Sequence, residues 1–360
     1  MTDSLIESLQ AKHLKDLKPY ESARRLFSGG QDWLNANESP FVGEYSLNSN
    51  KLNRYPDCQP KDVLQAYAAY AGVAPEQVLV SRGADEGIEL LIRAFCDAGQ
   101  DSILICPPTY GMYAISAETF NIGVEKAPLQ ADFSLDLDAM ATFAGKVKVV
   151  FICSPNNPTG TQVAPEQIEQ ALALFQDSAL VAVDEAYIEF AKDQGWAQQL
   201  AKYPNLVVLR TLSKAFGLAG IRCGFTLASP GVIQVLLKAI APYPLAEPVA
   251  QIAAQALSPP GLTWMQDKVS TLNSLRQTLQ NQLLALGDFI QLGDCQANFI
   301  LLRTAYKQAL MDDLVAQGIL IRDQSKQLGL ENCLRISIGT EEQNQRLIAA
   351  MQRFFKEKTQ

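Results

Sequence analysis

Five short apolar runs, rich in Val, Ile and Leu, constrain the fold of this chain more than any other feature of its sequence. They lie at residues 102–106, 148–153, 180–183, 206–209 and 223–227, and each is nearly continuous rather than alternating. Such runs are typical of strands covered on both faces, as in a mostly parallel sheet between helices. Helical spacing of apolar residues over 61–71 and 84–96, around a short strand at 77–81, continues the alternation. We therefore predict an α/β fold.

The pattern changes after about residue 260, where a second unit begins. A long helix over 262–284 is followed by a strand near 298–302, a helix, and a strand near 333–338. A chain of 360 residues forms two domains more often than one. We predict an N-terminal arm that belongs to a small domain (1–45), a large domain (46–258), and a C-terminal small α+β domain (259–360).

Composition argues against several classes of protein. A net charge of −8 disfavours a nucleic-acid binder, because neutralising phosphates needs a basic surface. The chain has no run of about 18 apolar residues for a membrane span, and its amphipathic N-terminus lacks the basic start of a signal peptide. Seven scattered cysteines without a C-x-x-C pair favour free thiols in the cytoplasm over disulfides or a metal site. The single histidine, His13, predicted on a surface helix, argues against Ser–His or Cys–His catalysis.

The strongest chemical signal is a lysine loop, TLSKAFG at 211–217, followed by Arg222 and Gly224. Lys214 comes just after a predicted strand, between a hydroxyl residue and a glycine, so it is well placed to meet a ligand at the strand ends. An isolated lysine in such a loop is more often a surface residue. Its significance therefore depends on three features that lie upstream.

Each of these features directly follows a predicted strand. Asp184 ends an apolar strand, where its charge can keep the pyridine nitrogen of a cofactor protonated, although alone it fits a helix N-cap equally well. The segment SPNNPTG at 154–160 fits a turn, but Asn157 can also bind a ring hydroxyl, and we predict a cis bond at Asn157–Pro158. The segment RGADEG at 82–87 opens a helix whose backbone N–H groups suit a phosphate, and it is neither a Walker loop nor G-x-G-x-x-G.

Along the chain, the helix-opening segment at 82–87 comes first, followed by the turn at 154–160, Asp184 and the lysine loop. This order of features resembles that of the fold-type I pyridoxal-phosphate enzymes. The resemblance to the histidinol-phosphate aminotransferase family covers nearly the whole chain, including LNRYPD at 52–57, PPTYG at 107–111, APYPL at 241–245 and LRISIGT at 334–340. The resemblance implies a large cofactor-binding domain with a mostly parallel sheet between helices and a smaller α+β domain. The RYP, GADEG and C-terminal RDQ segments carry the resemblance to this subfamily.

The resemblance also implies how the cofactor, pyridoxal 5′-phosphate, is held. Lys214 would bind it as a Schiff base and, once freed, act as a general base. Asp184 would pair with the pyridinium nitrogen, Asn157 and Tyr187 would bind the ring oxygen, and Tyr110 would stack on the ring. The implied phosphate ligands are the backbone N–H groups of Ala84 and Asp85, the side chains of Thr211, Ser213 and Arg222, and Tyr55 from the neighbouring subunit of a homodimer.

The implied reaction is amino transfer from L-histidinol phosphate to 2-oxoglutarate, which gives imidazole acetol phosphate and L-glutamate in histidine biosynthesis. One pocket must then accept a phosphate and carboxylates, and the guanidinium fork of arginine suits both. The candidates are Arg335 and Arg322, with Tyr20 and Asn37 as neighbours. Arg322 alone also fits a solvated loop charge, whereas Arg335 lies within an apolar strand pattern.

Two residues depart from the pattern of the family. Glu247 stands where a small hydroxyl residue is usual, and Gly217 replaces an alanine, which predicts a looser lysine loop.

Three rival functions stay open from the sequence. One is an aminotransferase for aromatic amino acids, and another is a lyase that decarboxylates a phosphorylated amino acid. The third is a cofactor-binding regulator, which is disfavoured because a fused DNA-binding domain has no room before residues 35–38.

Overall fold

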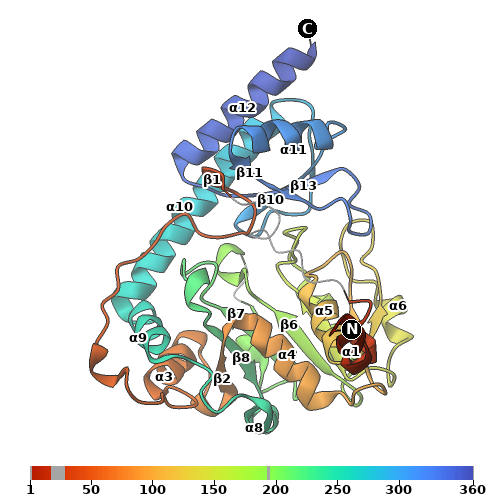
Figure 1. The fold of residues 1–360 in the computed structure, drawn as a ribbon, viewed down its shortest axis with the longest axis vertical. Coiled ribbons are helices and arrows are strands. Elements are labelled where there is room, and N and C mark those ends of the chain that lie inside the picture. The colour runs from red at the N-terminus through yellow and green to blue at the C-terminus, as the bar shows by residue number, and fades with distance from the viewer. Residues whose placement is uncertain (1, 18–28, 193–194, 360) are drawn as a thin grey trace.

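The computed structural model describes residues 2–17, 29–192 and 195–359, and its larger sheet has seven strands in the order β2-β8-β7-β6-β5-β3-β4 (Figure 1). Strands β3 to β7 run parallel, whereas β8 is antiparallel to both of its neighbours. The predicted mostly parallel sheet is confirmed. Its strands are β2 (Val78–Ser81), β3 (Ser102–Ile105), β4 (Gly123–Lys126), β5 (Val149–Cys153), β6 (Leu180–Asp184), β7 (Leu206–Thr211) and β8 (Gly224–Ala228).

Alternate residues of these strands enter two separate apolar cores, which explains why the runs are continuous. Val150 and Val208 face one core, which includes side chains of α3, α7 and α9, whereas Phe151 and Val207 face the other, which includes those of α4, α5 and α8. The covering helices are α3 (Lys61–Ala71), α4 (Gly83–Phe95), α5 (Met112–Thr119), α6 (Leu137–Ala141), α7 (Pro165–Leu174), α8 (Pro230–Ala239) and α9 (Glu247–Ala256).

The second unit is built on an antiparallel sheet in the order β12-β13-β10-β9. The long helix α10 (Pro259–Leu284) leads into it, starting three residues before the predicted 262 because Ser258 caps its N-terminus through Gly261 N–H. The other elements are β9 (Ile290–Leu292), β10 (Phe299–Arg303), α11 (Lys307–Ala316), β11 (Ile319–Leu320), β12 (Arg322–Asp323), β13 (Cys333–Ser337) and α12 (Glu341–Thr359).

The N-terminal segment joins both units. Strand β1 (Asp32–Trp33) pairs in parallel with β11, although almost 300 residues separate them. Before it, α1 (Thr2–Leu9) leads to a short 3-10 helix (Lys12–Leu14), where His13 Nε2 lies 3.1 Å from the carbonyl of Thr119. The domain boundaries at 45/46 and 258/259 stay predictions.

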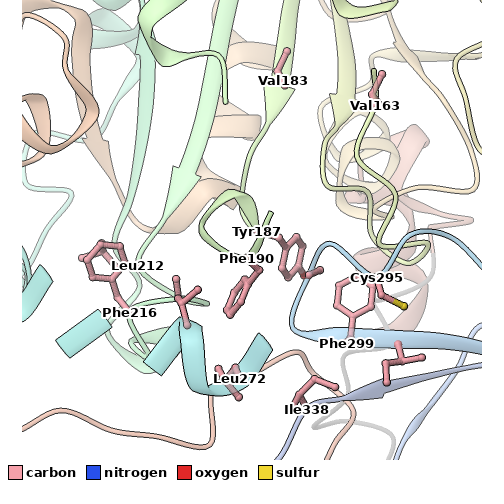
Figure 2. Packing of buried hydrophobic residues seen from close by; sticks show 14 of the residues in the cluster. Val163, Val183, Tyr187, Phe190, Leu212, Phe216, Leu272, Cys295, Phe299 and Ile338 are labelled. Carbon is pink, nitrogen blue, oxygen red and sulfur yellow. The ribbon is translucent and has the colours of Figure 1, made fainter. Parts of the chain in front are cut away.

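The two units are in contact through apolar side chains. Figure 2 shows Tyr187 and Phe190, just beyond β6, near Phe299 and Ile338 of the small unit. The rings of Tyr187 and Phe299 meet edge to face, with centroids 5.3 Å apart. The carboxyl ends of β5, β6 and β7 therefore face the small sheet rather than open solvent.

Two predictions that concern the whole chain can be compared with the structure. The seven cysteines are free thiols, as predicted. Among the helices of residues 2–17, 29–192 and 195–359, none combines the length and hydrophobicity that a membrane span requires.

Candidate active site

A cavity of about 440 Å³ lies at the carboxyl ends of the parallel strands, which is the usual place for a ligand in an α/β sheet. Of the predicted site residues, Tyr55 does not line it, and Tyr20 lies outside the described residues. All the others meet there: Asn37, Ala84, Asp85, Tyr110, Asn157, Asp184, Tyr187, Thr211, Ser213, Lys214, Arg222, Arg322 and Arg335. The structure thus brings together side chains from both units.

Lys214 is held in the loop that follows β7. The Lys214 carbonyl accepts the N–H of Gly217 at 3.2 Å, and its Nζ donates to the carbonyl of Ala36 at 3.1 Å. Burial lowers the pKa of Lys214 to about 8, and the positive charge of Arg335 adds to the effect. A substantial fraction of this amine is therefore neutral near physiological pH, as a nucleophile or base requires.

Asp184 is the last residue of β6, and its carboxylate is buried. One oxygen accepts the hydroxyl proton of Tyr113 at 2.6 Å, and the other accepts Ala186 N–H at 3.1 Å. Burial raises the pKa of Asp184 to about 6 despite these hydrogen bonds. A cationic partner in the cavity would stabilise the ionised form, so the carboxylate fits a protonated ring nitrogen.

Two side chains from distant segments converge on the hydroxyl of Tyr187. The Tyr187 hydroxyl accepts from Asn37 Nδ2 at 2.9 Å and from Asn157 Nδ2 at 3.4 Å. The other side of the Asn157 amide accepts from Arg335 Nη1 at 2.6 Å. The predicted cis bond at Asn157–Pro158 is confirmed, and the same loop contains a second one at Ser154–Pro155.

The N-terminus of α4 lies at one end of the cavity. Its backbone packs so closely on β8 that a Cβ at Gly224 would come within 2.3 Å of the Gly83 carbonyl carbon. Arg222 lies against this turn and donates to Asp85 Oδ2 at 3.0 Å and to Ser213 Oγ at 3.3 Å. Because backbone N–H groups of a helix N-terminus, a guanidinium and two hydroxyls meet here, the turn suits a phosphate.

The wall opposite the large sheet carries two arginines. Arg322 and Arg335 are paired in register on β12 and β13 and both line the cavity. Arg335 is only 7% exposed, donates to the Asn35 carbonyl at 3.0 Å, and lies over the ring of Phe299. Two guanidinium groups on one wall of the cavity favour an anionic ligand over a neutral one.

Asn37 holds the N-terminal segment on this wall. Its backbone has a left-handed φ of 53°, and its N–H donates to Ser337 Oγ at 2.8 Å. Sequence reasoning missed the neighbours Asn35 and Ala36, whose carbonyl oxygens accept from Arg335 and Lys214. It also missed Tyr113, which lies in the first turn of α5.

Three other predicted features lie away from the cavity lining. Tyr55 is 81% exposed and stacks on Tyr243, with centroids 4.4 Å apart. Glu247 begins α9 and accepts from Gln251 at 2.9 Å. Gly217 has a φ of 66°, and a Cβ there would come within 2.7 Å of the Phe41 carbonyl, so glycine allows a close contact at this point.

The fold and the cavity are typical of the pyridoxal-phosphate enzymes, and comparison with known proteins gives the same class. Residues 28–351 match the family described as aminotransferase class I and II, so the chain belongs to that family.

Its relatives define the branch within the family. The histidinol-phosphate aminotransferase of Pseudoalteromonas atlantica is 61% identical over 98% of this chain and 96% of the relative. That of Yersinia pseudotuberculosis is 56% identical over 96% of this chain and 91% of the relative. These identities place the chain among the histidinol-phosphate aminotransferases. A solved structure of that enzyme from Sinorhizobium meliloti, in complex with pyridoxal-5′-phosphate, has the same fold, with a TM-score of 0.85 at 23% identity over 97% of this chain and 98% of that one.

Proposed function

We propose that this protein transfers the amino group of L-histidinol phosphate to 2-oxoglutarate, giving imidazole acetol phosphate and L-glutamate in histidine biosynthesis. One observation carries the proposal: a half-buried lysine, a buried carboxylate and three arginines line a single cavity. Relatives that are 56–61% identical over nearly the whole chain bear the name of this activity.

The cavity fits pyridoxal 5′-phosphate, because its anion-binding turn, Asp184 and Lys214 line one space. When bound, this cofactor supplies an electron sink for negative charge at the substrate Cα. Asp184 keeps the pyridine nitrogen protonated, and Tyr110 covers the ring. Asn157 and Tyr187 bind the ring oxygen. The phosphate is held by Ala84 and Asp85 N–H, Thr211, Ser213 and Arg222.

Lys214 carries the proton in this proposal. Its amine would anchor the cofactor and be freed when the substrate amine takes its place. The free Nζ would take the proton from substrate Cα and deliver it to C4′ of the cofactor. Its lowered pKa supports this role, since a base with a pKa of about 8 is largely available at slightly alkaline pH.

The arginines bind the substrate anions. The guanidinium of Arg335 is fixed by Asn157 and Asn35, so it is preorganised for a bidentate contact. Arg322 adds a second positive charge toward the phosphate of histidinol phosphate. Asn37 completes this wall.

We also propose a cytoplasmic homodimer in which Tyr55 of one protomer reaches the cofactor phosphate in the partner. Large apolar side chains that are 52–81% exposed support an interface along residues 42–55: Val42, Leu47, Leu52 and Tyr55. Sedimentation of a dimer, and weaker phosphate binding in Tyr55→Phe, would support this arrangement. A monomer with full activity would refute it.

A steady-state assay tests the substrate assignment. Purified holoenzyme should form glutamate from 2-oxoglutarate only when L-histidinol phosphate is present. L-Histidinol, which lacks the phosphate, should react far more slowly because the arginines lose their partner. Equal rates with phenylalanine or tyrosine would instead identify an aromatic aminotransferase. Release of carbon dioxide from a phosphorylated amino acid without a keto acid would identify a lyase.

A further inference from the structure

Two pairs of consecutive residues at the ends of β6 and β7 point to opposite sides of the sheet. Asp184 lines the cofactor cavity, whereas Glu185 lines a separate cavity of about 260 Å³ together with Ser154 and Trp196. On β7, Thr211 lines the cofactor cavity, whereas the preceding Arg210 reaches toward Glu185. This is the alternation that a strand imposes on successive side chains.

Glu185 and Arg210 form an ion pair behind the site. Arg210 Nε lies 2.8 Å from Glu185 Oε2, and the side chains are 7% and 1% exposed. The backbone N–H of Glu185 also donates to the Leu209 carbonyl at 2.8 Å, which continues the pairing with β7 past the end of β6. A charge buried this deeply is costly without its partner, so each of the two side chains fixes the position of the other.

The second oxygen of Glu185 holds a loop in place. It accepts Trp196 N–H at 2.5 Å, and a Cβ at Gly195 would lie 2.5 Å from the same atom. The backbone can reach the carboxylate because residue 195 is glycine. The carboxyl group of Glu189, in the short 3-10 helix Ile188–Phe190, is a further acidic group that acts on Arg210.

We propose that the Glu185–Arg210 pair is a positioning device for the transfer reaction. It fixes the spacing between the ends of β6 and β7, so that Asp184 and the lysine loop engage the same cofactor. Neither side chain lines the cofactor cavity, and both act through the residue beside them. The inference rests on the proposed function, since it assigns Asp184 and Lys214 to one cofactor.

The test compares Glu185→Gln and Arg210→Met with the wild-type holoenzyme. Each variant should lower the rate constant of the half-reaction with L-histidinol phosphate by about tenfold or more, because small misplacements of reacting groups are costly. KM should change by less than about twofold, since the arginines of the substrate wall are untouched. The pH midpoint of the absorbance band of the lysine-linked cofactor should also shift. Arg210→Lys, which keeps the charge, should retain more of the rate than Arg210→Met.

Asp32→Asn is the matched control. It breaks another pair between a buried carboxylate and an arginine, since Asp32 accepts from Arg346 at 2.8 and 2.7 Å in the small unit. This variant should lose thermal stability and keep both the rate constant and the band midpoint. If the Glu185 and Arg210 variants behave in the same way, the pair is only structural and the proposal is wrong.

A second variant covers the case in which those two proteins fail to fold. Gly195→Ala keeps both charges and displaces the Trp196 backbone from Glu185, so it should shift the band midpoint in the same direction by a smaller amount. An unchanged midpoint would contradict the proposal. The midpoint is measured without substrate, so failure of wild-type protein to react with L-histidinol phosphate would overturn the proposed function and leave this test intact.

Discussion

The two walls of the cavity are assembled in different ways. The wall from the large sheet takes Asn157, Asp184 and Lys214 from the ends of β5, β6 and β7, which are neighbouring strands. The opposite wall joins Asn37 to Ser337, which are 300 residues apart in the chain. The first wall follows from strand order alone, because parallel strands end at one edge. The second depends on how the small unit packs.

This difference separates chemistry from recognition. Groups that could hold the cofactor and move protons lie on the first wall, at the ends of neighbouring buried strands. Groups that could select the substrate anion lie on the wall assembled from distant segments. Substitutions on the first wall should therefore affect every substrate, whereas substitutions on the second should discriminate among substrates.

The largest effect should come from the first wall. Lys214→Ala removes both the cofactor anchor and the general base, so the half-reaction should slow by about a thousandfold or more. Lys202→Ala is the control, because this exposed lysine pairs only with surface residues such as Glu169. Stopped-flow absorbance with L-histidinol phosphate measures both. A rate within tenfold of wild type in the Lys214 variant would show that Lys214 is not the general base.

Substitutions on the second wall should affect the two substrates to different extents. Arg335→Ala should lower kcat/KM at least about tenfold for histidinol phosphate and for glutamate, since both anions use this guanidinium. Arg322→Ala should weaken histidinol phosphate more than glutamate. Arg303→Ala is a control on the same sheet, because its guanidinium binds the carbonyls of Gly329 and Glu331 outside the cavity. Equal losses for both substrates in the Arg322 variant would contradict the assignment.

The pH dependence of cofactor capture connects the two walls. With a pKa of about 8, Lys214 in cofactor-free protein is mostly protonated at pH 7 and mostly neutral at pH 9. Capture should therefore be about tenfold faster at pH 9, because only the neutral amine attacks the aldehyde. Arg335→Met removes a positive charge that lowers this pKa, so the rise should move to higher pH. A rise that stays in place or moves to lower pH would argue against this coupling.

The smallest effect should be on stability. Gly217→Ala forces a side chain into a left-handed conformation close to the Phe41 carbonyl, so it should lower the free energy of unfolding by about 1–2 kcal/mol. Gly231→Ala in α8 is the matched control, because a Cβ there has open space and ordinary backbone geometry. It should be neutral or slightly stabilising. Denaturant unfolding compares the two, and equal stability would remove the close-contact explanation for Gly217.

Much of the first wall could be predicted from the sequence, because each residue follows a recognisable strand and belongs to a motif. Asn157, Asp184 and Lys214 were located in this way. The direction of β8 was not predicted, since an apolar run carries no sign of its orientation. Ala36 and Asn35 could not be found either, because they contribute backbone carbonyls that any residue would supply. The Glu185–Arg210 pair depends on two strands being neighbours, which neither segment shows alone.

The central claim is that Lys214 and the anion-binding wall act on one substrate. The most direct test follows the cofactor's absorbance in purified protein while L-histidinol phosphate is added without a keto acid. We expect the band of the lysine-linked cofactor to convert to that of pyridoxamine phosphate, to return on addition of 2-oxoglutarate, and not to convert in Lys214→Ala. A lysine-linked band that L-histidinol phosphate leaves unchanged would contradict the substrate assignment.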